Sequence, residues 1–287
     1  MIEHKPVLIK EVIKFFENVS KKENPVICDF TIGLGGHAEA LLKSYRNLKI
    51  IGFDRDETAL NYAKERLKDY SYRIELQKLN FANFDTAIDF KIDGALLDLG
   101  IGSHQLLDES RGFSFNSEFK LDMRMDKTQS LSAWEVVNKY PKDRLKEIFI
   151  KYGEIKNPKK VVDAIIEHRK KKEIFSCKEL AEIIASKLKK RGRIHPSTRF
   201  FQAIRIEVNK ELEELEIFLK KIFDYLNQKG VLVIISFHSL EDRLVKIAFK
   251  KRDDIKILTK KPITPDYEEI RKNPRSRSAK LRACEKL

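Results

Sequence analysis

The sequence predicts an α/β protein in which a smaller, all-helical domain interrupts an open, doubly wound parallel sheet. Short apolar runs alternate with amphipathic stretches over residues 26–98, which is the pattern of successive βαβ units. The next convincing buried strand comes only at residues 230–237. Because the crossover of a βαβ unit takes a few dozen residues at most, on the order of 100 residues are inserted before this strand.

The expected elements follow the chain in order. The first strand is Val26-Ile27-Cys28, and the second, third and fourth strands cover residues 49–53, 72–76 and 93–97. A helix is expected over residues 58–67, and another over residues 211–226 leads into the fifth strand. The last twenty residues are so basic that we expect part of this terminus to be mobile.

The insertion is expected to be helical. Residues 132–135 (SAWE) and 176–179 (SCKE) have the capping-box pattern that starts helices. We therefore predict a sheet domain made of residues 1–107 and 200–287, with an inserted helical domain over residues 108–199. We also expect the insertion to carry the docking surface for the partner of this chain.

The charge of the chain indicates an anionic partner. Its 287 residues include 58 Lys and Arg against 44 Asp and Glu, a formal charge of +14. A nucleic acid would neutralise this excess, whereas a Lys/Glu-rich surface of the kind found in heat-adapted proteins would also give a high charged content. Three local basic blocks, at residues 168–172, 187–193 and 271–282, favour nucleic acid.

Several classes of protein are disfavoured. No apolar run approaches the roughly 18 residues of a membrane span, and charged residues interrupt the N-terminus, so we expect neither a membrane protein nor a signal peptide. Cys28, Cys177 and Cys284 form no C-x-x-C pair, so neither a disulfide framework nor a metal site is expected. The expected location is the cytoplasm.

A glycine-rich loop directly follows the first strand. Residues 29–37 read DFTIGLGGH, an acid at a strand end followed by glycines that let a backbone approach a ligand. The second strand ends in Asp54, 21 residues after Gly33. An acid at about this spacing binds the ribose hydroxyls in nucleotide-binding α/β units. The pattern therefore predicts a nucleoside cofactor.

The acid at the start of this loop discriminates between two cofactors. Gly33, Gly35 and Ala38 also satisfy the loose dinucleotide fingerprint, which would suit a nicotinamide dehydrogenase. However, Asp29 would repel a pyrophosphate and would suit a cationic ligand, such as the ammonium and sulfonium groups of S-adenosylmethionine. We therefore favour S-adenosylmethionine over NAD.

Seven sequence blocks together closely resemble a known family. They are TIGLGGH (31–37), DLG (98–100), RGFSF (111–115), LDMRMD (121–126), HPSTRFFQAIRIEVN (195–209), SFHSLEDRLVK (236–246) and NPRSRSAKLRACEK (273–286). The resemblance, which spans nearly the whole chain, is to the bacterial ribosomal RNA small-subunit methyltransferase H family, also called MraW. It implies a Rossmann-like class I methyltransferase sheet and S-adenosylmethionine-dependent methylation of the exocyclic N4 of one cytidine in the decoding region of small-subunit (16S) ribosomal RNA.

The resemblance also implies which residues hold the cofactor. It places Gly35, Gly36 and His37 against the methionine part of S-adenosylmethionine and Asp54 on the ribose hydroxyls. These roles agree with the reading of the loop and of the second strand given above.

Further residues are implied around the adenine and the reacting end, namely Phe81, Asp98 and Gln105. A phenyl ring offers a face to adenine, and an amide can both donate to and accept from a purine edge.

Methylation of N4 needs an acceptor for the N–H groups of this amine, because the nitrogen shares its lone pair with the ring. Asp98 is the expected cofactor- or N4-contacting carboxylate, with His238 and Ser239 as candidates for base orientation or proton acceptance.

Two other functions stay open on the sequence. One is a non-catalytic ribosome-assembly factor that binds RNA, and the other, less favoured, is the nicotinamide-dependent dehydrogenase. The expected partner in the leading interpretation is ribosomal RNA, within the small subunit or an assembly intermediate. The sequence also leaves open whether the chain forms a homodimer.

Overall fold

The chain folds into two compact units. The computed structural model describes residues 6–188 and 195–287, so most of the basic block at 187–193 lies outside the described residues. The sheet unit comprises Met1–Gly100 and Leu212–Leu287, and the helical unit comprises Ile101–Glu211. The helical unit is therefore longer at both ends than the expected insertion of residues 108–199.

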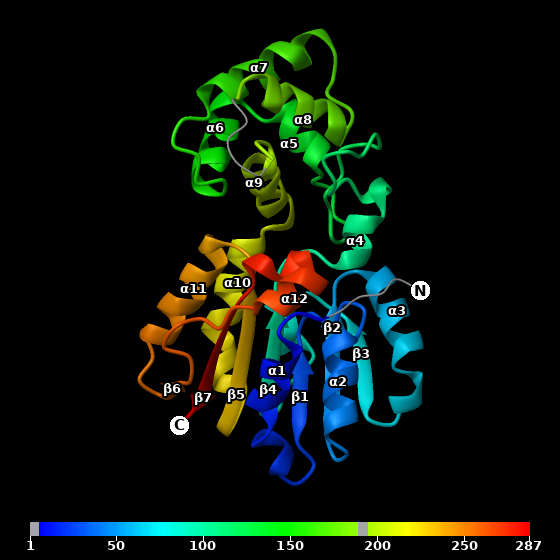
Figure 1. The fold of residues 1–287 in the computed structure, drawn as a ribbon, viewed down its shortest axis with the longest axis vertical. Coiled ribbons are helices and arrows are strands. Elements are labelled where there is room, and N and C mark those ends of the chain that lie inside the picture. The colour runs from blue at the N-terminus through cyan, green and yellow to red at the C-terminus, as the bar shows by residue number, and fades with distance from the viewer. Residues whose placement is uncertain (1–5, 189–194) are drawn as a thin grey trace. The chain divides into compact units, whose positions relative to one another are not determined.

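The sheet unit contains one seven-stranded sheet with the order β3-β2-β1-β4-β5-β7-β6 (Figure 1). The strands are β1 (Val26–Asp29), β2 (Lys49–Asp54), β3 (Ile74–Lys78), β4 (Ile92–Asp98), β5 (Leu226–Ser236), β6 (Ile255–Ile257) and β7 (Lys280–Lys286). The first five strands are parallel, as expected, whereas β7 pairs antiparallel with both β5 and β6. The predicted doubly wound sheet is confirmed, with two further strands that make it a mixed sheet.

The C-terminal strand also overturns the expectation of a mobile terminus. Leu281, Ala283 and Cys284 in β7 are fully buried, and the strand lies between β5 and β6. The basic residues between these apolar positions gave the segment its polar composition. Arg282 illustrates how such a residue is accommodated, because its guanidinium donates to the Asp242 carboxylate, with Nε 2.7 Å from Oδ1.

Helices cover both faces of the sheet (Figure 1). They are α1 (Ile9–Phe16), α2 (Gly36–Ser44), α3 (Glu57–Arg66), α10 (Glu211–Lys221), α11 (Ser239–Lys250) and α12 (Tyr267–Lys272), with short 3-10 turns at Val19–Lys21, Lys68–Tyr70, Phe81–Thr86, Ile222–Tyr225 and Pro274–Ser278. One apolar cluster joins α1, α2 and α3 to the sheet, and a second joins α10 and α11 to it. The sheet is therefore the middle of three layers.

The strand order creates a crevice at the carboxyl ends of β1 and β4. From β1 the chain moves outward to β2 and β3, and it then returns to place β4 on the other side of β1. The connections on the two sides of this point run in opposite directions, which opens the sheet edge to a ligand. Asp29 ends β1 and Asp98 ends β4, so both acids lie at this edge.

The helical unit contains α4 (Ser103–Leu107), α5 (Ala133–Lys139), α6 (Lys142–Lys151), α7 (Lys159–Lys171), α8 (Cys177–Ser186), α9 (Thr198–Asn209) and a 3-10 turn at Glu109–Arg111. The expected caps are present, because Ser132 and Glu135 form a capping box and Ser176 Oγ accepts from the N–H of Glu179. Among the described residues, no helix has the length and apolar character that a membrane crossing requires.

Polar contacts explain why α9 belongs to the helical unit. Asn209 Nδ2 donates to the carbonyl of Met123, and its Oδ1 accepts from the N–H of Met125, each at 2.8 Å. Glu207 accepts from the hydroxyl of Tyr140 at 2.9 Å. These contacts join residues far apart in sequence, and the helical unit ends at Glu211 rather than at the expected residue 199.

We expect Arg282→Ala to lower the free energy of unfolding by about 2 kcal/mol, because it leaves the half-buried carboxylate of Asp242 without its bidentate partner. Chemical denaturation with urea measures this. The control is Lys21→Ala, whose partner Glu17 is well exposed, so that its effect should stay below about 0.5 kcal/mol. Equal effects for the two variants would contradict a structural role for Arg282.

Candidate active site

The loop after β1 forms a bare helix N-terminus. Gly35 is the residue before α2 and has a φ of +77°, and a Cβ built on it would lie 2.9 Å from Leu67 Cδ1. Only glycine fits this position without strain. A glycine also has no side chain with which to cap the helix, so the first N–H groups of α2 can donate to an anion such as the carboxylate of an amino acid. This agrees with the expected place of the methionine part beside Gly35 and Gly36.

Asp54 ties the glycine loop to the end of β2. Its Oδ2 accepts from the N–H of Gly33 at 3.0 Å, and its Oδ1 accepts from the N–H of Asp56 at 2.8 Å. Asp56 in turn caps α3, because its Oδ1 accepts from the N–H of Thr58. The carboxylate is thereby held at the edge of the sheet, where its expected contact with a ribose stays a prediction.

Asp98 and His37 face each other at the end of β4. Asp98 Oδ2 lies 3.7 Å from His37 Nδ1, and His37 Nε2 lies 2.9 Å from the carbonyl of Val7. A contact with a carbonyl requires the proton on Nε2, which leaves Nδ1 facing the acid in the neutral ring. The other oxygen of Asp98, Oδ1, is buried without a hydrogen-bond partner among the described residues. A buried oxygen without a partner is destabilising, so a donor from a bound ligand would be favourable here.

Burial and mutual repulsion favour the neutral forms of two acids at this edge. The pKa of Asp98 is raised well above its ordinary value by burial, with further contributions from the charges of Asp29 and Glu241. Burial also raises the pKa of Asp29 to about 7; the N–H of Thr31 opposes the rise, and the charge of Asp54 adds to it. A cation placed here would relieve the repulsion and lower both pKa values. The edge is thus electrostatically suited to a positively charged ligand.

Asp29 supports the loop from within. Its side chain is only 2% exposed, and its Oδ1 accepts from the N–H of Thr31 at 3.2 Å. Thr31 Oγ1 then accepts from the N–H of Asp98 at 2.6 Å. The charge of the buried Asp29 can still act on a ligand at this edge without touching it. Asp54 and Asp98 are partly exposed, so these two acids are the ones that a ligand can contact.

Phe81 follows β3 and belongs to an aromatic cluster. It is 7% exposed, and its ring meets that of Phe218 edge to face, with centroids 5.7 Å apart. Phe30 packs into the same cluster against Phe53 and Phe218. The cluster positions the loop and the start of the 3-10 turn at Phe81, so a contact of this ring with adenine stays a prediction.

Gln105 belongs to the helical unit, whereas the other expected cofactor residues belong to the sheet unit. Its Oε1 accepts from the N–H of Gly102 at 3.0 Å, which closes the first turn of α4. Within its own unit Gln105 therefore acts as a capping residue. Its expected contact at the purine edge also stays a prediction.

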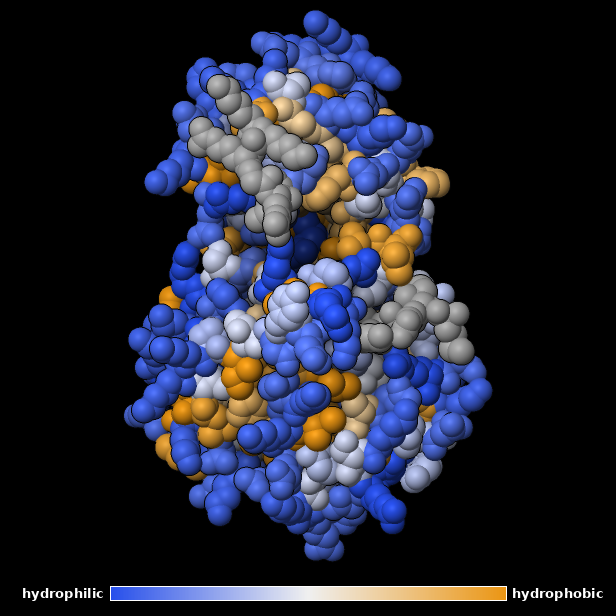
Figure 2. Space-filling model, viewed as in Figure 1, coloured by the Kyte–Doolittle hydropathy of each residue, from blue (hydrophilic) through white to orange (hydrophobic). Residues whose placement is uncertain are grey.

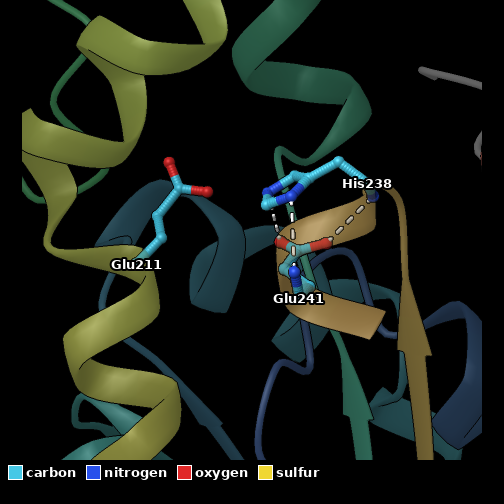
Figure 3. Close-up of side chains that lie close together, drawn as sticks. All are labelled: Glu211, His238 and Glu241. Carbon is cyan, nitrogen blue, oxygen red and sulfur yellow. Dashed lines mark hydrogen bonds and ion pairs between the residues drawn. The ribbon is translucent and has the colours of Figure 1, made fainter. Parts of the chain in front are cut away.

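His238 forms a capping box with Glu241 at the start of α11 (Figure 3). Its Nδ1 accepts from the N–H of Glu241 at 3.4 Å, while Glu241 Oε2 accepts from the N–H groups of Phe237 and His238 at 2.8 and 3.3 Å. His238 Nε2 also lies 3.1 Å from Glu241 Oε1. These contacts give the imidazole a structural role, and Ser239 is exposed as the first residue of the helix. Catalytic roles for the two side chains stay predictions.

Sequence reasoning missed three residues at this edge. Thr31 joins the loop to β4 as described above, and Glu214 on α10 accepts from Asn80 Nδ2 at 2.7 Å and pairs with Arg55 at 3.0 Å. Asn80 lies just after β3 and directly before Phe81, so its place after a strand could have marked it as a residue of this edge. Glu214 is more than 130 residues away on an ordinary amphipathic helix, and nothing local distinguishes it.

A hollow of about 660 Å³ lies on the sheet unit, lined by three lysines, two glutamates, Asn18 and apolar side chains of α1, β5 and the β6 region. Val231 in its wall pairs with Gly94, toward the amino end of β4. That end lies opposite the carboxyl edge of the parallel strands. Figure 2 shows several apolar patches among the hydrophilic side chains of the visible face. This hollow is therefore separate from the candidate site.

Comparisons with known proteins assign the family. The model of the MraW methylase family matches residues 1–287. The chain is 49% identical over 297 residues to the ribosomal RNA small subunit methyltransferase H of Persephonella marina, and 48% identical to that of a Sulfurihydrogenibium species, with 100% of both chains covered in each case. Among solved structures, an rRNA methylase from Streptococcus thermophilus aligns over 100% of this chain and 99% of its own, with 14% identity and a TM-score of 0.49. On the full-length family match and these identities, the chain belongs to the MraW methylase family.

Proposed function

We propose that this protein is an S-adenosylmethionine-dependent methyltransferase of ribosomal RNA, and that it methylates the exocyclic N4 of a cytidine in the decoding region of the small-subunit RNA. The observation that carries the proposal is the carboxyl edge of the sheet. There an uncapped helix N-terminus, the carboxylate of Asp54 and an oxygen of Asp98 that has no hydrogen-bond partner among the described residues lie at the ends of the neighbouring strands β1, β2 and β4. Membership of the MraW methylase family supports the same reaction.

Each group at the edge suits one part of the cofactor. The first N–H groups of α2 suit the carboxylate of its methionine part, and Asp54 suits the ribose hydroxyls. The two raised acid pKa values favour a ligand that brings positive charge, which a pyrophosphate-linked nicotinamide cofactor would not do at this position. When bound, S-adenosylmethionine supplies an activated methyl group on a sulfonium.

Asp98 is the residue best suited to act on the nucleophile. Its Oδ1 lacks a partner within the described part of the protein, so an N–H of the target amine would satisfy it. Accepting this hydrogen bond concentrates the lone pair on N4 and draws the proton away as the carbon–nitrogen bond forms. A positive charge nearby favours the ionised form of Asp98, so the acceptor becomes available when the cofactor site is filled.

The distribution of charge supports RNA as the partner of the helical unit. Residues 101–211 contain 25 Lys and Arg against 16 Asp and Glu, which is +9 of the total +14. Such an excess in little more than a third of the chain suits a polyphosphate backbone. A target base would have to leave its stack to reach Asp98. We propose that the substrate is the small subunit or an assembly intermediate, and that the reaction takes place in the cytoplasm. Whether the protein forms a homodimer is tested by light scattering.

The function is tested with tritiated S-adenosylmethionine and three substrates: free small-subunit RNA, assembled small subunits and large-subunit RNA. We expect label only in the first two, and mass spectrometry of the digested RNA should identify N4-methylcytidine. Binding of both cofactor and RNA without transfer would support the non-catalytic assembly factor instead. Calorimetric titration with NAD, for which we expect no binding, tests the dehydrogenase.

We expect Asp54→Ala to weaken S-adenosylmethionine binding by about 10- to 100-fold, because it removes charged hydrogen bonds to the ligand and also releases the N–H of Gly33. Isothermal titration calorimetry measures the dissociation constant. Glu57→Ala is a matched control, since this nearby acid is exposed and pairs with Lys78. Unchanged affinity in Asp54→Ala would remove Asp54 from the proposed site.

A further inference from the structure

Two of the sequence blocks that the cofactor site does not use meet in the helical unit. Phe115 comes from the block RGFSF, and His195 and Phe201 come from the block HPSTRFFQAIRIEVN. The imidazole of His195 stacks on the ring of Phe115, with centroids 5.1 Å apart and planes 19° from parallel. Phe115 in turn meets Phe201 edge to face at 4.8 Å. The blocks are thus joined by a three-ring arrangement.

The innermost ring of this arrangement is buried, and the outermost ring is exposed. Phe201 is 5% exposed and anchors the stack in the core of the unit. Ser197 is fully buried; its hydroxyl donates to the carbonyl of Ala181 at 3.2 Å, and its N–H donates to His195 Nδ1 at 3.3 Å. The imidazole is therefore held in one orientation, although His195 itself is exposed. An ordered aromatic ring on the surface costs little further entropy when a flat ligand covers it.

The surroundings of the stack are cationic. Arg199, exposed on the first turn of α9, donates through Nη2 to the carbonyl of Glu154 at 2.6 Å. A carbonyl acceptor orients the guanidinium without cancelling its charge. The unit as a whole carries +9, as noted above. An exposed aromatic face beside oriented positive charge is how proteins bind unpaired nucleotides.

We propose that His195, stacked on Phe115, is a platform on which an unpaired base of the RNA substrate stacks, with Arg199 contacting the adjoining phosphate. The proposal rests on the proposed function for the identity of the RNA. It adds a defined contact surface for single-stranded RNA in the helical unit. A duplex has no unstacked base to offer, so single-stranded RNA is the form of the substrate that suits an exposed ring.

The test compares variants of the full-length protein in their affinity for a fluorescent single-stranded ribonucleotide of small-subunit sequence, measured by anisotropy. We expect His195→Ala to weaken binding by about 10-fold, and His195→Tyr, which keeps a ring, to restore it. His195→Lys keeps positive charge without a ring, and we expect it to bind as weakly as His195→Ala. Binding to a duplex of the same sequence should change less than 2-fold in all three variants.

The matched control is Phe175→Ala, which removes another exposed aromatic side chain of the same unit, 52% exposed, and should leave binding unchanged. Melting temperatures should be the same for all four variants, since the altered side chains are exposed. Unchanged affinity in His195→Ala, or full affinity in His195→Lys, would overturn the platform. Calorimetric binding of S-adenosylmethionine by these variants separates this result from a failure of the proposed function, because none of the altered residues is among the proposed cofactor residues.

Discussion

Replacing Asp98 with asparagine is expected to lower the rate of methyl transfer by about 10³-fold. The amide keeps the size of the side chain, and the N–H of residue 98 keeps its bond to Thr31 Oγ1. What is lost is a carboxylate able to accept a proton as the methyl group arrives. Transfer of tritium from labelled cofactor to RNA in single turnovers measures the effect.

Two controls identify the lost step. Asp89→Asn changes an exposed acid close to β4 and should leave the rate unchanged. Calorimetry should show that Asp98→Asn still binds S-adenosylmethionine, weakened by no more than about 10-fold through the loss of one negative charge. A variant that transfers methyl groups at the normal rate would exclude Asp98 as the proton acceptor.

Asp29→Asn is expected to stabilise the protein at alkaline pH by at most about 4 kcal/mol. Burial raises the pKa of Asp29 from 3.8 to about 7 in the folded state. Below pH 4 the side chain is neutral in both folded and unfolded chains, so folding is not penalised. As the pH rises from about 4 to 7 the unfolded chain ionises first, and stability falls until the folded form ionises as well.

Asparagine does not ionise, so the variant does not lose stability as the pH rises. Its Oδ1 can still accept from the N–H of Thr31. Its advantage over the native protein should therefore grow between pH 4 and 7 and stay constant above pH 7. Urea denaturation across this range measures the difference. A difference that does not depend on pH would show that Asp29 is not the group that titrates.

The sequence was sufficient to predict the parallel half of the sheet, because each of its strands carries its own signal. Val26-Ile27-Cys28 ends in an acid and a glycine loop, and the run ending at Asp98 behaves in the same way. The antiparallel β7 carries no such signal. In the segment around Arg282, apolar residues alternate with basic ones, and only the distant partners β5 and Asp242 make that pattern a buried strand.

The candidate site divides in the same manner. Gly35 and Asp54 were predictable, because a positive φ and a carboxylate at a strand end are encoded locally. The role of His238 was harder to infer, since it was a candidate for base orientation or proton acceptance, whereas the structure shows that it forms a helix cap with Glu241. Glu214 and the partners of Asp98 depend on chain segments brought together by folding. Their positions follow from tertiary structure alone.

The position of β7 inside the sheet constrains how the molecule can fold. This strand follows β6 in the chain, yet it lies between β5 and β6 in the sheet. Without β7, β5 would present an unpaired, strongly apolar strand edge, and such edges promote aggregation. A substitution that keeps β7 from pairing would consequently favour an aggregation-prone intermediate over a merely loosened enzyme.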